Sequence, residues 1–383
     1  MAAFELHTTP SIVVQRGASA TLADRAQALG ARSVLIVTDG GVLAAGLLDA
    51  ALAPFSTRGV RVAVFSDVQA DPPEAVIEAA VAQAVASGAD AIVGFGGGSA
   101  MDVAKLVALL APGRERLGDV YGVGRARGPR LPLVLVPTTA GTGSEVTPIS
   151  IVTTGAGEKK GVVSPVLLPN LALLDAELTL GLPPHVTAAT GIDAMVHAIE
   201  AFTSKRLKNA FSDGMAREAL RLLSQNIGAA TRNGSDVDAR ENMLLGACLA
   251  GMAFANAPVA GVHALAYPIG ARFHVPHGLS NALMLAPVMR FCFEAALPLY
   301  AELAPIMLPG VAGTERARAL ALTRYLASLS GELGLPQRLS QVGIAASDLQ
   351  RLADDAMQQT RLLVNSPREI RLEDALALYQ EAL

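Results

Sequence analysis

The chain has 383 residues, of which 51% are hydrophobic and 17% charged, and its formal net charge is −4. This length favours two domains, and the composition is typical of a folded protein with large cores rather than a disordered or fibrous one. Lys and Arg are scattered, aromatic residues are scarce and Trp is absent, which argues against a nucleic-acid-binding surface.

The long apolar stretches are interrupted by Gly, Pro or charged residues, so we expect no transmembrane helix and no membrane partner. The N-terminus lacks the basic and apolar regions of a signal peptide, which predicts a cytoplasmic protein. Cys248 and Cys292, the two cysteines, lie in apolar runs. We expect them to be buried free thiols rather than a disulfide.

The first 180 residues alternate short β-branched runs with Ala-rich stretches of helical periodicity, such as 73–88. The runs are nearly continuous in apolar residues, as strands buried on both faces of a parallel sheet are. This alternation predicts an α/β domain. The predicted strands are 33–39, 61–67, 90–98, 131–139 and 170–178.

Two loops that follow predicted strands carry the composition of phosphate-binding segments. The first, Gly96-Gly-Gly-Ser99, opens a predicted helix, where backbone amides and the helix dipole favour an anion. It is not the Gly-x-Gly-x-x-Gly fingerprint, and a tight strand-to-helix turn is the alternative. The second, Pro137–Thr147, is dense in hydroxyls and glycines, with a helix cap as its alternative. Together they favour a nucleotide over a simple phosphate.

Two charged residues belong to the same hypothesis. Asp39 ends the 33–39 strand, where a carboxylate can bind ribose hydroxyls and repel a 2′-phosphate, so it favours NAD over NADP. A turn-capping aspartate is the alternative. Lys160 is a candidate contact to the phosphates or the nicotinamide side, against a solvated hairpin lysine.

The residue pattern of the sequence changes after Gly181-Leu-Pro-Pro184. The rest of the chain has almost no runs of β-branched residues. Long helical stretches follow, with predicted breaks at 233–234, Pro258, Pro268, Pro276 and Pro336. We therefore expect an α/β domain over 1–182 and an all-helical domain over 183–383. A cleft between two such domains is a common place for a ligand site.

Asp193 and His197 lie four residues apart in an otherwise apolar or small-residue stretch. On a helix they share one face. A buried carboxylate needs a partner, and a cation is a plausible one, with an N-cap role for Asp193 and a core role for His197 as the alternatives.

Further imidazoles lie downstream, at His263, His274 and His277. Folding has to bring them to the first pair, since Pro and Gly residues separate them, and His274 competes with His277 as a ligand. His7 and His185 are expected at the surface. Three imidazoles and one carboxylate suit Fe(II), Zn(II) or another first-row divalent ion.

The motifs together resemble the iron-containing (group III) alcohol dehydrogenases over essentially the whole chain. The segments that carry the resemblance are GGGSAMDVAK (96–105), PTTAGTGSEVT (137–147), AATGIDAMVHAIEAF (188–202) and GVHALAYPIGARFHVPHGLSNALMLAP (261–287). It implies an N-terminal parallel-sheet dinucleotide-binding domain, a C-terminal helical metal-binding domain with the metal in the cleft, and a homodimer.

The resemblance also assigns residues. The metal ligands it implies are Asp193, His197, His263 and His277. The dinucleotide contacts it implies are Asp39, Gly97, Gly98, Ser99, Thr138, Thr139, Thr147 and Lys160.

One position departs from the family pattern. Four residues after His263, where many members carry a histidine thought to assist proton relay, this chain has Tyr267. A tyrosine, with a pKa of about 10, is a poor base at neutral pH. His274 is the candidate to take over part of the relay, with ribose hydroxyls and water as the alternative. The tyrosine is also compatible with a different substrate, such as a hydroxy acid.

The expected activity is metal-dependent hydride transfer between NAD(H) and a small alcohol, aldehyde or ketone. Within enzymes, the alternatives are a hydroxyacid-oxoacid transhydrogenase, a maleylacetate reductase-type enzyme and a dehydroquinate synthase-like lyase. A carboxylate substrate would need a cation, for which Arg272 is a candidate. A non-catalytic nucleotide- or metal-binding sensor is the alternative outside enzymes.

Overall fold

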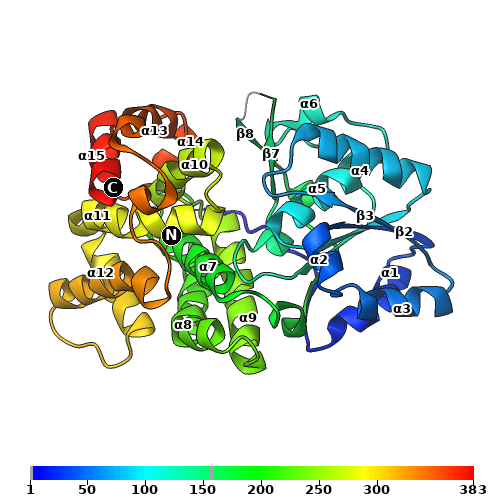
Figure 1. Cartoon of the computed structure of the whole chain (residues 1–383), viewed down its shortest axis with the longest axis horizontal. Coiled ribbons are helices and arrows are strands. Elements are labelled where there is room, and N and C mark those ends of the chain that lie inside the picture. The colour runs from blue at the N-terminus through cyan, green and yellow to red at the C-terminus, as the bar shows by residue number, and fades with distance from the viewer. Residues whose placement is uncertain (1–2, 156–157) are drawn as a thin grey trace. The chain divides into compact units, whose positions relative to one another are not determined.

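The computed structural model describes residues 3–155 and 158–383. It divides into two compact units, one spanning His7–Gly181 and the other Leu182–Leu383 (Figure 1). The described residues before His7 group with the second unit, and the ring of Phe4 lies 5.8 Å from that of Phe211.

The first unit is built on a parallel six-stranded sheet in the order β1-β9-β6-β4-β2-β3. The five predicted strands are all present, and β1 is an additional edge strand without a long apolar run. The strands are β1 (Ile12–Val14), β2 (Ser33–Asp39), β3 (Arg61–Val68), β4 (Ala91–Gly96), β6 (Leu133–Pro137) and β9 (Leu171–Leu174).

Helices cover both faces of this sheet, which explains the continuous apolar runs. In β2, Leu35 and Val37 face one hydrophobic cluster, formed with α4 and α5, while Val34 and Ile36 face the other, formed with α1 and α3. The helices and 3-10 turns are η1 (Ala18–Thr21), α1 (Leu22–Ala28), α2 (Gly40–Ala44), α3 (Asp49–Thr57), α4 (Glu74–Ala86), α5 (Gly98–Leu110), α6 (Leu117–Val120), η2 (Ser144–Val146), η3 (Pro165–Leu167) and η4 (Ala176–Thr179).

The strand order changes direction at β2, since β3 lies on one side of it and β4 on the other. In open parallel sheets, the crevice at the carboxyl ends of such strands is where ligands bind. Asp39 ends β2, and the Gly96–Ser99 turn joins β4 to α5. The fold thus places both predicted segments at this switch point.

A second sheet, not predicted from the sequence, has the order β5-β8-β7. Its strands are short and largely exposed or partly exposed, with buried residues alternating only in β7, so they lack the continuous apolar run of the main sheet. They are β5 (Gly122–Val123), β7 (Ile149–Thr153) and β8 (Lys159–Val163).

The second unit is helical throughout, as predicted. Its α-helices are α7 (Pro184–Thr203), α8 (Ala210–Arg232), α9 (Val237–Asn256), α10 (Gly261–Phe273), α11 (His277–Met307), α12 (Glu315–Glu332), α13 (Leu349–Ala356), α14 (Thr360–Leu363) and α15 (Leu372–Ala382), and its 3-10 turns are η5 (Leu339–Val342) and η6 (Ala346–Asp348). Within this unit α7 packs among α8, α9 and α11 (Figure 1). Every residue of α7 from 191 to 203 is buried, which is typical of a core helix.

One sequence-based expectation about helix breaks is wrong. Pro268 lies inside α10 rather than ending a helix, and the buried Tyr379 hydroxyl donates a 2.6 Å hydrogen bond to the Leu265 carbonyl in the turn before it. Packing therefore stabilises the helix through the proline, although the proline disfavours helix locally.

Helix α11 also continues through three prolines, and it is long and apolar enough to span a membrane. Half of its most apolar window is buried within the protein, as in the core helices of soluble proteins.

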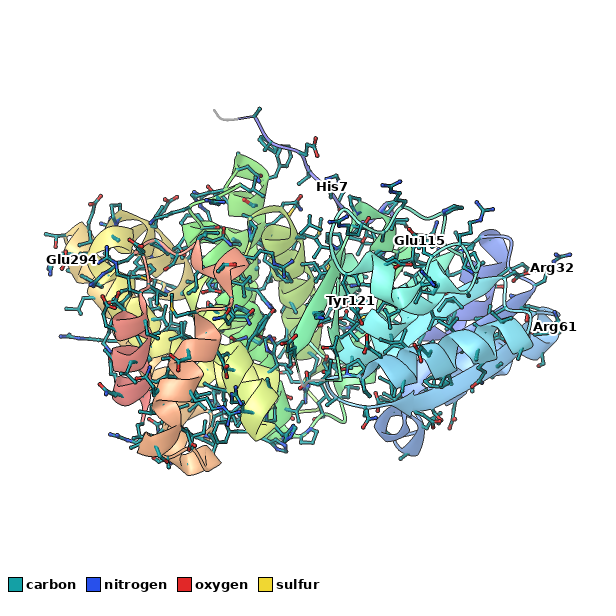
Figure 2. The ribbon with its side chains drawn as sticks, turned by 90° about the horizontal axis from the view of Figure 1, so that it is seen from above. His7, Arg32, Arg61, Glu115, Tyr121 and Glu294 are labelled. Atoms are coloured by element: carbon teal, nitrogen blue, oxygen red, sulfur yellow. The ribbon has the colours of Figure 1, made fainter. Side chains whose placement is uncertain are left out.

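Charged side chains lie mainly at the surface, where Arg32, Arg61 and Glu294 project outward (Figure 2). The Arg32 side chain is 90% exposed. Cys248 and Cys292 are buried free cysteines, as expected. Ionisable groups in the interior are the exception: several lie at the two candidate sites described next, and Asp175 and Arg240 are buried elsewhere.

Candidate functional site

Four predicted ligands converge within the helical unit. Asp193 and His197 project from α7, His263 lies in the first turn of α10, and His277 is the first residue of α11. One ligand atom from each of the four residues lies within 4.8 Å of the others. The Nε2 atoms of His197, His263 and His277 lie 3.9, 3.8 and 3.6 Å from Asp193 Oδ1.

These distances fit a shared cation. Atoms bound to one first-row ion at about 2.1 Å lie about 3 to 4 Å from one another. Asn281, one turn after His277, adds a second observation: its buried Nδ2 lies 2.6 Å from Asp193 Oδ1, 3.1 Å from His263 Nε2 and 3.2 Å from His277 Nε2. An amide nitrogen has two N–H donors, so it can donate to two of these three atoms at once, and all three atoms face one region. The donor set is therefore suited to a divalent cation.

Burial separates the four ligands into an inner and an outer part. Asp193, His197 and His263 are nearly inaccessible, whereas the His277 side chain is 34% exposed. His197 stacks on Phe254 at 4.4 Å and on His263 at 4.7 Å between ring centroids. An ion held here would be shielded from solvent by the buried Asp193, His197 and His263, and solvent would reach it from the side of His277.

The Asp193 carboxylate is kept ionised by its surroundings. Burial raises the pKa of Asp193, but the attraction of the three facing imidazoles in their protonated form and the Asn281 hydrogen bond outweigh burial, so the pKa lies below its ordinary value. An ionised carboxylate is the form that a metal ion binds.

The close approach of α11 to α7 depends on Gly278. A Cβ atom at this position would lie 2.5 Å from the Ala189 carbonyl oxygen on α7. Any side chain would push the two helices apart, because the obstacle is backbone. The Gly after His277 therefore lets this ligand reach the pair on α7.

A carboxylate from α7 holds the start of α10. Glu200 Oε2 accepts hydrogen bonds from the backbone N–H of Ala260 (2.9 Å) and lies 2.7 Å from His263 Nδ1, while Oε1 accepts from Val262 N–H (2.6 Å). Ala260, at the N-cap of α10, has no side chain to cap the helix. Glu200 therefore replaces the missing cap across the helix interface.

Tyr267 and His274 differ in their relation to this cluster. The ring of Tyr267 lies 6.3 Å from that of His263 and 5.7 Å from that of His277. His274 is exposed at the C-cap of α10, in a left-handed conformation with φ of 54°. The four-residue cluster does not include it. Arg272 is engaged in an ion pair with Asp355, and that hydrogen bond raises the pKa of the guanidinium.

The two predicted phosphate loops meet in the first unit. A Cβ on Gly98, at the start of α5, would lie 2.8 Å from Thr142 Cγ2, and one on Gly97 would lie 3.8 Å from Thr139. Thr138 N–H donates to the Gly96 carbonyl at 3.0 Å. Both loops thus line the amino end of α5, where Ser99 is partly exposed in the first turn.

Asp39 serves as a helix cap and keeps one oxygen toward the glycine turn. Its Oδ1 accepts from Gly41 and Val42 N–H at 2.9 and 3.0 Å, so the capping interpretation is correct for this atom. Its Oδ2 lies 3.3 Å from where a Gly96 Cβ would stand. The carboxylate can therefore cap α2 and still face the switch point.

A buried network that was not foreseen anchors the second loop to α5. Lys105 Nζ donates to Ser144 Oγ (2.7 Å), Thr147 Oγ1 (3.2 Å) and the Ile149 carbonyl (2.7 Å). Asp102 Oδ1 accepts from Ser144 Oγ at 2.6 Å. Burial lowers the pKa of Lys105, which Asp102 partly offsets. Thr147 thus supports the loop, and a direct contact with a dinucleotide remains a prediction.

The other charged positions of this unit lie in different settings. Burial raises the pKa of Glu145 to about 7, against the opposing effects of its own backbone N–H and of Lys105. Lys160 is exposed on β8, with Nζ 5.8 Å from the centre of the Tyr121 ring. Its role toward a cofactor remains a prediction.

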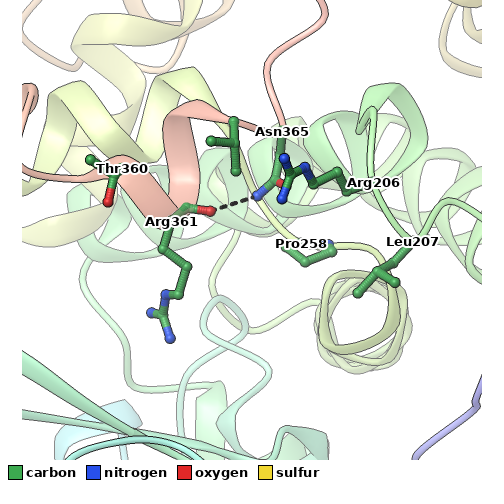
Figure 3. Close-up of a pocket in the computed structure, with 7 residues that line it drawn as sticks. Arg206, Leu207, Pro258, Thr360, Arg361 and Asn365 are labelled. Carbon is green, nitrogen blue, oxygen red and sulfur yellow. Dashed lines mark hydrogen bonds between the residues drawn. The ribbon is translucent and has the colours of Figure 1, made fainter.

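Besides the cluster, the helical unit contains a surface pocket of about 630 Å³ (Figure 3). Asn365 forms part of it and donates hydrogen bonds to the carbonyls of Val259 (2.9 Å) and Arg361 (3.1 Å). None of the four cluster residues lines this pocket. Its lining residues are Arg206, Leu207, Pro258, Thr360, Arg361, Val364 and Asn365.

Comparison with known sequences identifies the family. Residues 9–176 match the family described as iron-containing alcohol dehydrogenase, and residues 187–383 match the C-terminal part of the Fe-containing alcohol dehydrogenase family. The chain belongs to the iron-containing alcohol dehydrogenases. The relatives of this family that it matches are alcohol or aldehyde oxidoreductases, so the chain is an oxidoreductase.

Individual relatives match nearly the whole chain. Long-chain-alcohol dehydrogenase 1 of Geobacillus thermodenitrificans is 41% identical over 96% of this chain and 93% of its own. The crystal structure of a 1,3-propanediol oxidoreductase superposes with a TM-score of 0.96 at 32% identity, covering 100% of both chains. That of sulfoacetaldehyde reductase from Bifidobacterium kashiwanohense in complex with NAD+ has a TM-score of 0.88 at 28% identity, covering 99% of each.

Sequence reasoning about this dehydrogenase missed the supporting residues. Glu200 follows Asp193 by seven positions and His197 by three, so it shares their helix face. A charge in that apolar stretch was a usable signal. Asn281, one turn after His277, had no comparable signal. Polar residues are common in the first turns of helices, so a single asparagine there does not stand out.

Proposed function

We propose that the chain is a metal-dependent dehydrogenase that transfers a hydride between NAD(H) and a small alcohol, aldehyde or ketone. The observation that carries the proposal is the cluster of Asp193, His197, His263 and His277, whose ligand atoms lie within 4.8 Å of one another. Three of these residues are buried and the fourth is partly exposed, as expected of a catalytic site with an open position.

The four residues would hold Fe(II), with Zn(II) as the alternative, since both accept imidazole and carboxylate. When bound, a divalent ion supplies Lewis-acid chemistry toward an alcohol or carbonyl oxygen. The chain's own part is to keep the Asp193 carboxylate ionised and to exclude water from the inner side through Phe254 and the stacked imidazoles.

For the cofactor, we propose NAD at the switch point of the parallel sheet. The amino end of α5 offers free backbone amides for the pyrophosphate, with Gly97, Gly98 and Ser99 as the contacts. Thr138, Thr139 and Thr147 from the second loop and Lys160 are the further proposed contacts. Asp39 would bind ribose hydroxyls through its free side and disfavour NADP, whose 2′-phosphate it would repel. When bound, the nicotinamide supplies the hydride chemistry.

Tyr267 and His274 are the proposed catalytic residues, Tyr267 as a contact to the substrate and His274 in proton handling. The Tyr267 ring is close to two of the cluster imidazoles, which favours it as the residue that contacts the substrate. His274 lies at the exposed end of α10, where it would exchange protons with solvent. We also propose that the enzyme is a homodimer, which analytical ultracentrifugation tests, and that it acts in the cytoplasm.

A substrate panel tests the proposed function. Protein loaded anaerobically with Fe(II) is given NAD+ or NADP+ with primary alcohols of increasing length, diols and hydroxy acids, and NADH formation is followed. We expect turnover with alcohols and at least about tenfold higher kcat/KM with NAD+ than with NADP+. With a substrate deuterated at the carbinol carbon, the deuterium should appear in the reduced cofactor.

Two results would contradict this proposal. Oxidation of hydroxy acids alone, coupled to an oxoacid without free NADH, would assign the transhydrogenase alternative. Binding of NAD+ without turnover on any member of the panel would assign a sensor. The ion pair of Arg272 with Asp355 gives the carboxylate-substrate alternatives no free cation at that residue.

A further inference from the structure

Glu200 lies outside the predicted ligand set, yet it reaches that set directly. It is 4% exposed and lies on the face of α7 that carries Asp193 and His197. Its carboxylate meets three groups of one short segment, the backbone N–H of Ala260, that of Val262 and the Nδ1 of His263. The start of α10 is thus held against α7 at the turn that carries the ligand His263.

The three contacts fix the direction of the hydrogen bond to His263. A backbone N–H can only donate, so both Glu200 oxygens are acceptors. The same Oε2 atom that accepts from Ala260 lies 2.7 Å from His263 Nδ1. That nitrogen must therefore carry the proton, because two acceptors facing each other would repel. Since a neutral imidazole has one N–H, its Nε2 is left with the lone pair.

The opposite edge of the His263 ring agrees with this tautomer. His263 Nε2 lies 3.1 Å from Asn281 Nδ2, which is a donor, and 3.8 Å from Asp193 Oδ1. A lone pair on Nε2 satisfies the amide and points at the other ligand atoms. The reverse tautomer would place an N–H against a donor on one side and leave two acceptors in contact on the other.

We propose that Glu200 is a positioning residue that sets the tautomer of His263, so that Nε2 faces the cluster as a ready ligand. The proposal rests on the proposed metal site only for its effect on metal binding. The tautomer itself is a property of the protein alone. It also explains why the α10 start is capped by a carboxylate from another helix, since one group both caps the helix and orients the ring.

Nitrogen-15 NMR of chelator-treated protein labelled in histidine tests the tautomer, at a pH about two units above the usual imidazole pKa of about 6.5. In the wild-type protein we expect a protonated Nδ1 and an unprotonated Nε2 for His263, assigned by comparison with His263→Ala. An unprotonated Nδ1 in the wild type would overturn the proposal without any variant at Glu200.

The variant Glu200→Gln provides a second test of the proposed tautomer. Glutamine keeps the shape but has one acceptor oxygen, so its NH2 must face either a backbone donor or Nδ1. We expect the His263 signals to shift toward the reverse tautomer, and the affinity for Zn(II), measured by competition with a chelating dye, to fall about 10- to 100-fold. Unchanged signals and an affinity within twofold of wild type would overturn the proposal.

The matched control is Tyr379→Phe, which removes a different buried hydrogen bond to α10, the one to the Leu265 carbonyl. It should lower thermal stability but leave the His263 signals and the zinc affinity within twofold. If it shifts both as Glu200→Gln does, the effect is general loosening of α10 and the proposal is wrong. If the protein binds no metal but shows the predicted tautomer, the proposed function fails while this inference stands.

Discussion

At the scale of single residues, both candidate sites contain buried ionisable groups. Asp193 and Glu200 contact the imidazoles of the cluster, Glu145 belongs to the second loop, and Lys105 on α5 binds that loop. Burial of a charge is costly unless a partner stabilises it. The first two are compensated by imidazoles and amides, whereas Glu145 is compensated only in part, so that its pKa rises to about 7.

Glu145 predicts a pH dependence of stability. Because its folded-state pKa is about 7 and its ordinary value 4.5, its protonated form favours the fold. That contribution, about 3 kcal/mol for a shift of this size, is complete below about pH 4.5 and is lost as the pH rises through 7. Thermal unfolding of Glu145→Gln should show a gain in melting temperature over wild type that is larger at about pH 8 than at about pH 5.

The control for this measurement is Glu78→Gln, at an exposed position of the same unit. It should alter the melting temperature little and equally at both pH values. A Glu145→Gln variant with the same offset at both pH values would show that the carboxyl titrates normally.

Tyr267 gives a prediction about the proton route. Tyr267→His places a group with a pKa of about 6.5 beside His263 and His277, where it can act as a base at neutral pH. We expect kcat for alcohol oxidation to rise several-fold near neutral pH and its pH profile to extend to lower pH. Tyr267→Phe should stay within about twofold of wild type. Loss of activity in Tyr267→Phe would mean that the phenol itself carries the proton.

The four cluster residues were predictable because a histidine or carboxylate stands out in an apolar helix or beside Gly and Pro. The choice of His277 over His274 was not settled by pattern alone and came from resemblance. In the structure His277 starts α11, and Gly278 lets that helix approach α7. Asn281 and Lys105 were not predicted, since their importance arises from contacts between segments far apart in the chain.

At the scale of elements, the proposed dinucleotide site of the first unit is formed by two loops that pack against the amino end of α5. Gly98→Ala should disturb this contact, because its Cβ would lie 2.8 Å from Thr142 Cγ2 and the second loop would have to move. We expect the Kd for NAD+ to rise at least about tenfold, which corresponds to about 1.4 kcal/mol. Isothermal titration calorimetry measures it.

Two further variants serve as controls for the Gly98→Ala measurement. Gly118→Ala adds a methyl group where nothing lies within 4 Å and should leave the Kd unchanged. Adding Thr142→Ser to Gly98→Ala removes the obstructing methyl group and should restore much of the affinity. An affinity of Gly98→Ala within twofold of wild type would place the dinucleotide elsewhere.

The long elements of the main sheet and the helical unit follow from sequence periodicity, since buried strands and core helices differ in pattern and length. Pro268 was misread as a break, because tertiary packing around α10 outweighs the local cost of proline. The β5-β8-β7 sheet was missed, because strands of two to five residues at a partly exposed position have no distinctive pattern.

At the scale of the whole molecule, each compact unit contains one candidate site: the dinucleotide loops lie within His7–Gly181 and the imidazole cluster within Leu182–Leu383. The grouping of the described N-terminal residues with the helical unit, where Phe4 meets Phe211, has no local signal in the sequence. Because each candidate site lies within its own unit, a change in one should leave ligand binding by the other intact.

The most direct test of the central claim is NADH formation by chelator-treated, Fe(II)-reconstituted and His263→Ala protein, with NAD+ affinity measured on all three. We predict that chelation abolishes turnover, that Fe(II) restores it, and that His263→Ala lowers kcat/KM at least about a hundredfold while its Kd for NAD+ stays within twofold. Turnover by the metal-free protein, or equal activity in His263→Ala, would contradict the account.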